Sequence, residues 1–191
     1  MKNKPRAFVD VETTGLLHGY HEIIEICILK EDGSIFHTKV HPTEPDRIDA
    51  RAAAVNGYHP TGWKDAMEPN RAAAEIGSHL DGCVIIGHNP RFDYLFIKDL
   101  LDANHVKNWI DPRVIDTTTL AYVHLVPHGL RRLSLDEIRR FLGWKVRRYH
   151  NALSDTRDVQ RLYNLLNNPV EKHFVLIRNH FRRWWGCDDR Y

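Results

Sequence analysis

The sequence predicts an α/β domain of three layers, in which helices flank a mixed β-sheet. The first 40 residues are rich in strand-like segments that include a hairpin, and helical and strand-like segments alternate after them. The chain has 191 residues, of which 42% are hydrophobic, so it can bury one sizeable core but has no room for a second domain of ordinary size. We therefore expect a single domain over residues 1–191.

Three strands are expected near the N-terminus. Residues 7–12 form a buried, mostly apolar segment that ends at Thr13-Thr14-Gly15, and residues 23–29 form a second apolar run. Residues 31–34 have the composition of a turn, so residues 35–40 should return beside the second strand as an antiparallel hairpin. The hairpin is what makes the expected sheet mixed.

The rest of the chain is expected to alternate between helices and short strands. Brief apolar segments at residues 83–87 and 114–115 predict two further strands. Helices are predicted from alanine-rich stretches, capping residues and breakers. They are expected near residues 51–55, 71–80, 91–101, 118–123, 135–142, 152–166 and 170–185.

The composition excludes several classes of protein. Cys27, Cys83 and Cys187 are far apart and form no Cys-x-x-Cys pair, which argues against a disulfide framework and against a thiolate zinc site. No apolar run approaches the ~18–20 residues of a membrane span, and the polar first residues precede no signal-peptide stretch. We therefore expect a cytoplasmic protein without a membrane partner.

The charge is unevenly distributed along the chain. Residues 1–130 contain 13 Lys and Arg against 18 Asp and Glu, whereas residues 131–191 contain 14 against 7. A basic C-terminal part is one of the simple signs of a surface that binds a polyanion such as nucleic acid. The alternative is a set of exposed helices in which arginine serves solubility alone.

Asp10 and Glu12 are the first carboxylates that suggest chemistry, because they lie two residues apart on the first predicted strand. Side chains at this spacing leave the same face of a sheet, so the two carboxylates converge. They repel each other and are costly to bury, and a divalent cation relieves both penalties. Oxygen ligands on a rigid strand suit Mg²⁺ or Mn²⁺ better than zinc. The alternative is a strand end in solvent.

Two further acidic residues are predicted at helix starts. Asp93 follows the turn at Gly87 and falls on the first turn of a helix, where it is either part of a site or a charge stabilised by the helix dipole. Asp155 follows His150 by five positions, which is a rotation of roughly 140° on an ideal helix. His150 must therefore precede the helix if both are to face one site, and Asn151 can cap the helix after it.

Three segments resemble, in order and spacing, the three motifs of the DnaQ-like (DEDDh) 3′-5′ exonucleases. They are residues 8–15, 88–93 and 150–155, which read FVDVETTG, HNPRFD and HNALSD. The resemblance extends from about residue 6 to about residue 166, so the final ~25 residues, which include the C-terminal helix, lie outside it. It implies an RNase H-like three-layer fold: a five-stranded mixed sheet with an antiparallel second strand, flanked by helices.

The resemblance also implies an activity. The expected enzyme is a metal-dependent 3′-5′ exonuclease that releases nucleoside 5′-monophosphates from the 3′ end of DNA, single-stranded or frayed. Two Mg²⁺ or Mn²⁺ ions would be held by the four carboxylates, with His150 as the general base that takes a proton from the attacking water. The implied metal ligands are Asp10, Glu12, Asp93 and Asp155.

Matching positions of the family also contact the terminal nucleotide. The residues implied in substrate binding are Thr13, Gly15, Leu16, Asn89 and Phe92. Asn56 stands where many relatives have histidine, and Pro90 stands where a small residue is usual. The resemblance places both of these positions near the substrate cleft. A polymerase partner is compatible with the resemblance, but the sequence does not indicate one.

Two other functions remain open. A DEDDh exoribonuclease that acts on RNA or oligoribonucleotides would use the same motifs, although DNA is the favoured substrate. A non-catalytic module that binds nucleic acid is a different class, and the retention of all five motif residues argues against it.

The helix expected at residues 170–185 lies outside the resemblance. An apolar stripe at helical spacing is expected to dock on the domain. The stripe consists of Val170, Phe174, Ile177, Phe181 and Trp185. Lys172, Arg182 and Arg183 would then lie on other faces, where they could help to guide a nucleic-acid strand.

Overall fold

The computed structural model describes the backbone of residues 4–184 and the side chains of residues 4–178. The chain divides into two compact units. Among the described residues, the first comprises 4–116 together with Tyr149–Val159, and the second comprises Thr117–Arg148 and 160–184. Every residue predicted to form the active site belongs to the first unit, and a single domain over the whole chain stays a prediction.

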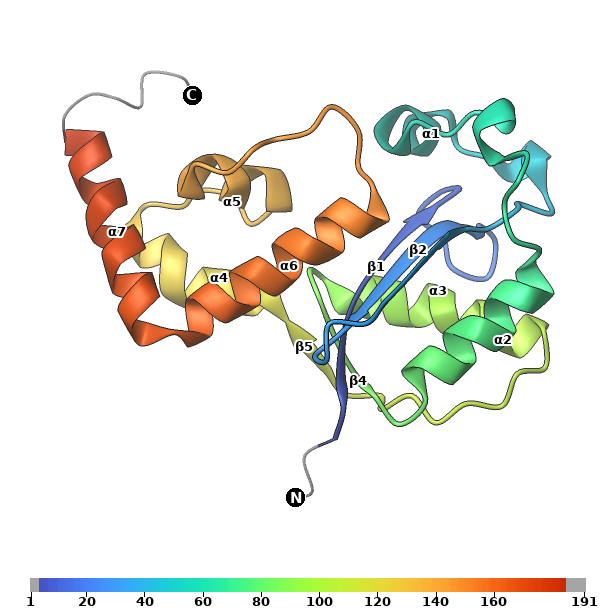
Figure 1. Cartoon of the computed structure of the whole chain (residues 1–191). Coiled ribbons are helices and arrows are strands. Elements are labelled where there is room, and N and C mark those ends of the chain that lie inside the picture. Colours follow the sequence, from blue (N-terminus) through green and yellow to red (C-terminus); the bar gives the residue numbers. More distant parts are fainter. Residues whose placement is uncertain (1–3, 185–191) are drawn as a thin grey trace. The chain divides into compact units, whose positions relative to one another are not determined.

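The first unit is built on a five-stranded mixed sheet with the strand order β3-β2-β1-β4-β5 (Figure 1). The strands are β1 (Arg6–Thr13), β2 (Ile23–Lys30), β3 (Ile35–Lys39), β4 (Val84–Gly87) and β5 (Val114–Asp116). β2 is antiparallel to β1 and β3, whereas β4 pairs in parallel with both β1 and β5. The predicted mixed sheet with an antiparallel second strand is confirmed.

The helices of the described residues lie within a few residues of their predicted bounds. They are α1 (Ala50–Asn56), α2 (Pro69–Leu80), α3 (Pro90–Ala103), α4 (Thr117–Leu125), α5 (Leu135–Leu142), α6 (Ala152–Asn167) and α7 (Pro169–Trp184), with short 3-10 helices η1 (Pro45–Arg47), η2 (Pro60–Trp63) and η3 (Val126–His128). The predicted cap of α5 is present, because the Ser134 hydroxyl accepts a hydrogen bond from the Glu137 N–H and Gly143 ends the helix at a φ of 71°.

One face of the sheet forms the main hydrophobic core. Val9 and Val11 of β1 and Ile26 and Ile28 of β2 pack there, and the other members of the cluster include Ile76 of α2 and Phe96 and Ile97 of α3. The intervening residues of the strands point to the opposite face. The beginning of α6 lies on that face, where the Thr156 hydroxyl is 3.5 Å from the Cys27 carbonyl oxygen. The sheet of the first unit is therefore covered on both faces.

The second unit has a separate core of leucine and isoleucine side chains. Leu125 of α4, Ile138 of α5 and Leu162 of α6 are buried in it, and Val175 and Leu176 of α7 pack against it. No helix in the described part of the chain is long and apolar enough to cross a membrane.

The predicted docking stripe of α7 is wrong where its side chains are described. Val170, Phe174 and Ile177 are exposed to 62%, 68% and 41%. The neighbouring row of α7 that contains Val175 and Leu176 packs against the core instead. Hydrogen bonds from two basic side chains of α7 to nearby carbonyl groups fix the helix in this rotation. One anchor is the Arg178 guanidinium, which donates to the Leu142 carbonyl at 3.2 Å.

Lys172 is a second anchor, since its ammonium donates to the Leu166 carbonyl at 3.3 Å. The side chains of Phe181, Arg182, Arg183 and Trp185 lie outside the described residues. The predicted guiding role of the two arginines therefore stays a prediction.

Candidate active site

Asp10 and Glu12 project from β1 on the face opposite the main core, as the strand alternation predicted. Glu12 is only 8% exposed, and Asp10 is half-buried. Their cross-strand neighbours on β2 are Cys27 beside Asp10 and Glu25 beside Glu12. Two acidic side chains of β1 and one of β2 are thus concentrated on one face.

Asp93 approaches the same strand from the first turn of α3. Its Oδ1 accepts a hydrogen bond from the backbone N–H of Val11 at 2.9 Å. The turn before the helix brings Gly87 and Pro90 close together, and only glycine fits at position 87 without a shift. A Cβ atom there would lie 2.8 Å from the Cβ of Pro90, which is too close. Asn89 then takes the left-handed conformation with a φ of 66° before α3 begins. The sequence HNPRFD therefore places Asp93 against β1.

His150 precedes α6, as the helical rotation required, and Asp155 lies in its first turn. The Nδ1 atom of His150 is 3.4 Å from the Oδ2 atom of Asp155. Asn151 caps the helix, because its Oδ1 accepts from the Ser154 N–H at 3.2 Å. The backbone N–H of His150 donates to the Val55 carbonyl at 3.0 Å, which holds this segment against α1.

Burial and mutual repulsion raise the pKa values of the clustered carboxyls. Burial is the largest cause of the raised pKa of Asp10, and the charges of Asp93 and Asp155 add to it. Burial, followed by the charges of Asp155 and Glu25, raises the pKa of Glu12 to about 8. Burial also raises the pKa of Asp93 to about 7, against the opposing effect of backbone hydrogen bonds. The charged forms of these groups are therefore disfavoured as they stand.

The donor set fits a divalent cation. Glu12, His150 and Asp155 each offer one ligand atom, and the three atoms lie within 4.8 Å of one another. The Asp93 carboxylate is close enough for its charge to raise the pKa values of both Asp10 and Glu12. A cation among these groups would replace repulsion with attraction, and a set dominated by carboxylates suits Mg²⁺ or Mn²⁺. This is the one such group of possible ligands in the described part of the chain.

A cavity of about 320 Å³ lies next to Glu12. Four of the predicted substrate-binding residues line it, namely Thr13, Gly15, Leu16 and Phe92. Leu16 is 79% exposed, so it presents an apolar side chain at the edge of the cavity. Asn89 does not line the cavity, and its backbone N–H instead donates to the Asp116 carboxylate at 3.1 Å.

The other wall of the cavity comes from α1, which sequence reasoning largely missed. Asp49, Arg51, Ala52, Val55 and Asn56 line this wall. Asn56 connects the two walls, because its side-chain amide donates to the Thr13 carbonyl at 3.0 Å. The sequence pointed to this wall only through Asn56, which precedes Gly57 and stands where many relatives have histidine.

The turn after Glu12 is fixed by its own contacts. The Thr13 hydroxyl donates to the Gly15 carbonyl at 2.6 Å. A Cβ atom on Gly15 would lie 2.3 Å from the His21 ring, so any larger residue there would force this histidine side chain to move. The turn is therefore held by a hydrogen bond of its own and by close packing against His21.

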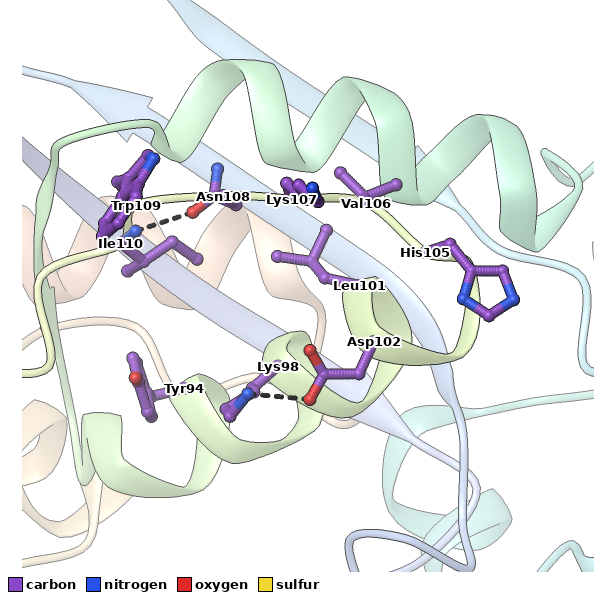
Figure 2. Close-up of a pocket in the computed structure, with 10 residues that line it drawn as sticks. All are labelled: Tyr94, Lys98, Leu101, Asp102, His105, Val106, Lys107, Asn108, Trp109 and Ile110. Carbon is purple, nitrogen blue, oxygen red and sulfur yellow. Dashed lines mark hydrogen bonds and ion pairs between the residues drawn. The ribbon is translucent and has the colours of Figure 1, made fainter.

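Figure 2 shows a second cavity of about 490 Å³, formed by α3 and the loop after it. Lys98 and Asp102 on α3 form an ion pair at 2.7 Å, and Tyr94, His105 and Trp109 also line the cavity. None of the predicted site residues lines it. Of the residues expected to carry chemistry, Glu12 lines the smaller cavity, and His150 and Asp155 each offer a ligand atom close to that of Glu12.

The comparison with protein families identifies one match. The model of the RNase_T family, described as an exonuclease, matches residues 7–163. This range includes all three of the motifs and the sheet that positions them.

Similar chains are found among large polymerases. A DNA polymerase III PolC-type of Thermotoga petrophila is 31% identical over 166 residues, which are 85% of this chain and 12% of that protein. A DNA polymerase III PolC-type of Caldanaerobacter subterraneus subsp. tengcongensis is 29% identical over 158 residues, which are 81% of this chain and 11% of that protein. The chain thus spans only a small part of the length of these relatives.

Among solved structures, the chain is similar to Escherichia coli Exonuclease I in complex with a dT13 oligonucleotide. The TM-score is 0.73 at 16% identity, and the match covers 90% of this chain and 43% of that one. The apo form of Exonuclease I gives a TM-score of 0.72 at 17% identity, with 91% of this chain and 44% of that one covered. This likeness confirms the predicted fold.

Proposed function

The chain belongs to the RNase_T exonuclease family, and we propose that it is a metal-dependent 3′-5′ exonuclease that releases nucleoside 5′-monophosphates from the 3′ end of DNA. The observation that carries the proposal is the convergence of Glu12, His150 and Asp155 beside a cavity. Asp10 lies on the same face of β1 as Glu12, and Asp93 reaches β1 from the start of α3, close enough for its charge to raise the pKa of Asp10.

Asp10, Glu12, Asp93 and Asp155 would hold two Mg²⁺ or Mn²⁺ ions. Bound there, the ions would activate a water molecule and stabilise the leaving 3′ oxygen. The raised pKa values of Glu12 and Asp93 support this assignment, because burial disfavours both charged carboxylates, neighbouring carboxylates add to the effect at Glu12, and a cation would offset these costs.

His150 would act as the general base. Imidazole is the side chain that titrates nearest to neutral pH, and it accepts a proton from a water molecule within hydrogen-bond reach. The Asp155 carboxylate, 3.4 Å from Nδ1, would stabilise the imidazolium that forms. We assign His150 to proton transfer rather than to metal binding because Mg²⁺ and Mn²⁺ prefer oxygen ligands.

The cavity beside Glu12 would accept the terminal nucleotide. Leu16 and Phe92 offer apolar surface to a base, and the hydrogen-bonded turn at Thr13 and Gly15 would hold Leu16 near Glu12. DNA is favoured over RNA because the PolC-type relatives are named as DNA polymerases and Exonuclease I is similar to the chain in a complex with a dT13 oligonucleotide. A cytoplasmic location stays a prediction, and a polymerase partner stays compatible with the family without being predicted.

The test uses matched single strands of DNA and RNA, labelled at the 5′ end and incubated with Mg²⁺. We expect a ladder of DNA products shortened from the 3′ end, nucleoside 5′-monophosphates as the released product, and slower degradation of RNA. EDTA should stop the reaction. Cleavage of a closed circular single strand at the same rate as the linear strand would contradict the exonuclease assignment, and faster degradation of RNA would favour the exoribonuclease.

A further inference from the structure

Glu25 is a buried carboxylate that the proposed chemistry does not use. It lies on β2 directly opposite Glu12, and it is only 2% exposed. Like charges directly opposite each other in a sheet are destabilising, so this residue carries a cost that its neighbours must offset. Its role was not visible in the sequence, where it falls within an apolar strand.

Two hydrogen bonds meet at one oxygen of this carboxylate. The Nε2 atom of His37 on β3 lies 2.7 Å from Oε1 of Glu25. The side-chain amide of Asn151 donates to the same oxygen at 2.7 Å. A carboxylate only accepts hydrogen bonds, so both partners act as donors. Oε1 of Glu25 is therefore occupied by protein donors.

Asn151 connects Glu25 to the segment that carries the histidine. Its Nδ2 atom donates to Glu25, while its Oδ1 atom caps α6 by accepting from the Ser154 N–H. His150 is the preceding residue, and its backbone N–H is held by the Val55 carbonyl. The segment is thus tied to β2 on one side and to α1 on the other.

We propose that Glu25 is a positioning residue, which holds Asn151 and thereby fixes the His150 imidazole relative to Asp155 and Glu12. The inference rests on the proposed function of His150 as general base. It assigns Glu25 no contact with substrate or metal. A displacement of about 1 Å in a catalytic group can cost roughly 100-fold in rate, so a bond that fixes His150 has a measurable effect.

The test compares three variants near neutral pH with saturating Mg²⁺. E25A removes the acceptor, and N151S keeps a residue that caps helices well but is too short to reach Glu25. We expect each to lower kcat by about 10- to 100-fold while KM changes by less than about twofold. E25Q removes the charge but keeps a carbonyl oxygen that can accept both hydrogen bonds, so it should retain at least about half of the wild-type kcat.

Two controls separate positioning from other effects. H37A removes the other donor to Oε1 and should lower kcat by less than about twofold, because the bond to Asn151 remains. In the H150A background the further change E25A should have little effect on kcat, because residues that act through one group are not additive. An undiminished effect of E25A in that background would overturn the proposal.

A second readout does not depend on activity. In the metal-free protein, the imidazole NMR signals of His150, assigned with H150A, should shift or broaden in E25A and N151S but not in E25Q. Wild-type kcat in E25A and N151S, or an E25Q variant as impaired as E25A, would contradict the proposal. If the wild-type protein degrades no DNA, the proposed function fails, whereas the NMR comparison still tests the positioning.

Discussion

The two faces of the sheet in the first unit are made by alternate residues of the same strands, yet their chemistry is opposite. On one face, Val9 and Ile26 are fully buried in the core that includes side chains of α2 and α3. On the other face, Asp10, Glu12 and Glu25 crowd together. The difference separates stability from chemistry, because burial of the apolar face stabilises the folded state, whereas the crowded carboxylates of the other face destabilise it.

The largest effect is expected from a change on the carboxylate face. Asp10→Asn keeps the size of the side chain but removes the charge that would bind the metal ions. We expect turnover of single-stranded DNA to fall by at least about 10³-fold, since such charges stabilise the transition state through the metals. The loss should be measured as initial rates at saturating Mg²⁺.

The matched control lies one residue away on the opposite face. Val9→Ala should lower the free energy of unfolding by about 2 kcal/mol and leave kcat of the folded protein within about twofold of wild type. If Val9→Ala impaired turnover as much as Asp10→Asn, the division between the two faces would be wrong.

The next largest effect is expected from His150→Ala. Loss of a general base costs about 10²- to 10⁴-fold in rate, so kcat should fall in this range with KM nearly unchanged. His105→Ala serves as the control, because His105 lines the second cavity away from the carboxylates. A reduced affinity for DNA with an unchanged kcat would assign His150 to substrate binding instead.

A smaller effect should separate the two cavities. Leu16→Ala removes an exposed apolar side chain from the cavity beside Glu12 and should raise KM about tenfold, the value expected when a leucine loses its buried contact with a ligand. Trp109→Ala removes a side chain that is 83% exposed at the second cavity and should leave KM unchanged. The reverse pattern would move the substrate site to the second cavity.

The smallest effect concerns the stability of the metal-free protein. The pKa of Glu12 is raised in the folded state from its ordinary value of 4.5 to about 8. Between these two pH values, Glu12 is therefore protonated in the folded protein but ionised in the unfolded chain. Its contribution to the free energy of unfolding therefore falls as the pH rises through that window. Glu12→Gln should be more stable than wild type at pH 8 by about 1 kcal/mol or more and similar below pH 4.

Urea denaturation in EDTA at both pH values would measure this difference. Added Mg²⁺ should reduce or reverse the advantage of Glu12→Gln at pH 8, because the wild-type protein binds the metal better. Equal pH dependence in the two proteins would show that Glu12 is not held at a raised pKa.

Local patterns in the sequence indicated where each of the five motif residues would lie, and the resemblance to the DnaQ-like exonuclease motifs predicted that they share one site. Strand alternation fixes the direction of Asp10 and Glu12, and a helix start fixes Asp93 and Asp155. The position of His150 outside α6 followed from the rotation of a helix once His150 and Asp155 were required to face one site. These residues could be predicted because each depends on neighbours a few positions away.

Other parts depend on contacts between distant segments and could not be predicted. Glu25 meets Asn151 across a separation of 126 residues, and no local pattern marks the pair. The cavity wall formed by α1 depends in the same way on the bond from Asn56 to Thr13. On α7, two apolar rows were available, and tertiary contacts of Lys172 and Arg178 favoured the one that was not predicted.

The central claim is that the carboxylate face of the sheet is a metal-dependent catalytic centre. Anomalous diffraction from crystals soaked with Mn²⁺ and a nucleoside 5′-monophosphate would test it most directly. We predict two manganese peaks ~3.5–4 Å apart among Asp10, Glu12, Asp93 and Asp155, with the nucleotide in the cavity beside Glu12. Manganese peaks found only elsewhere, or a nucleotide bound in the second cavity while the carboxylates hold no metal, would contradict the account.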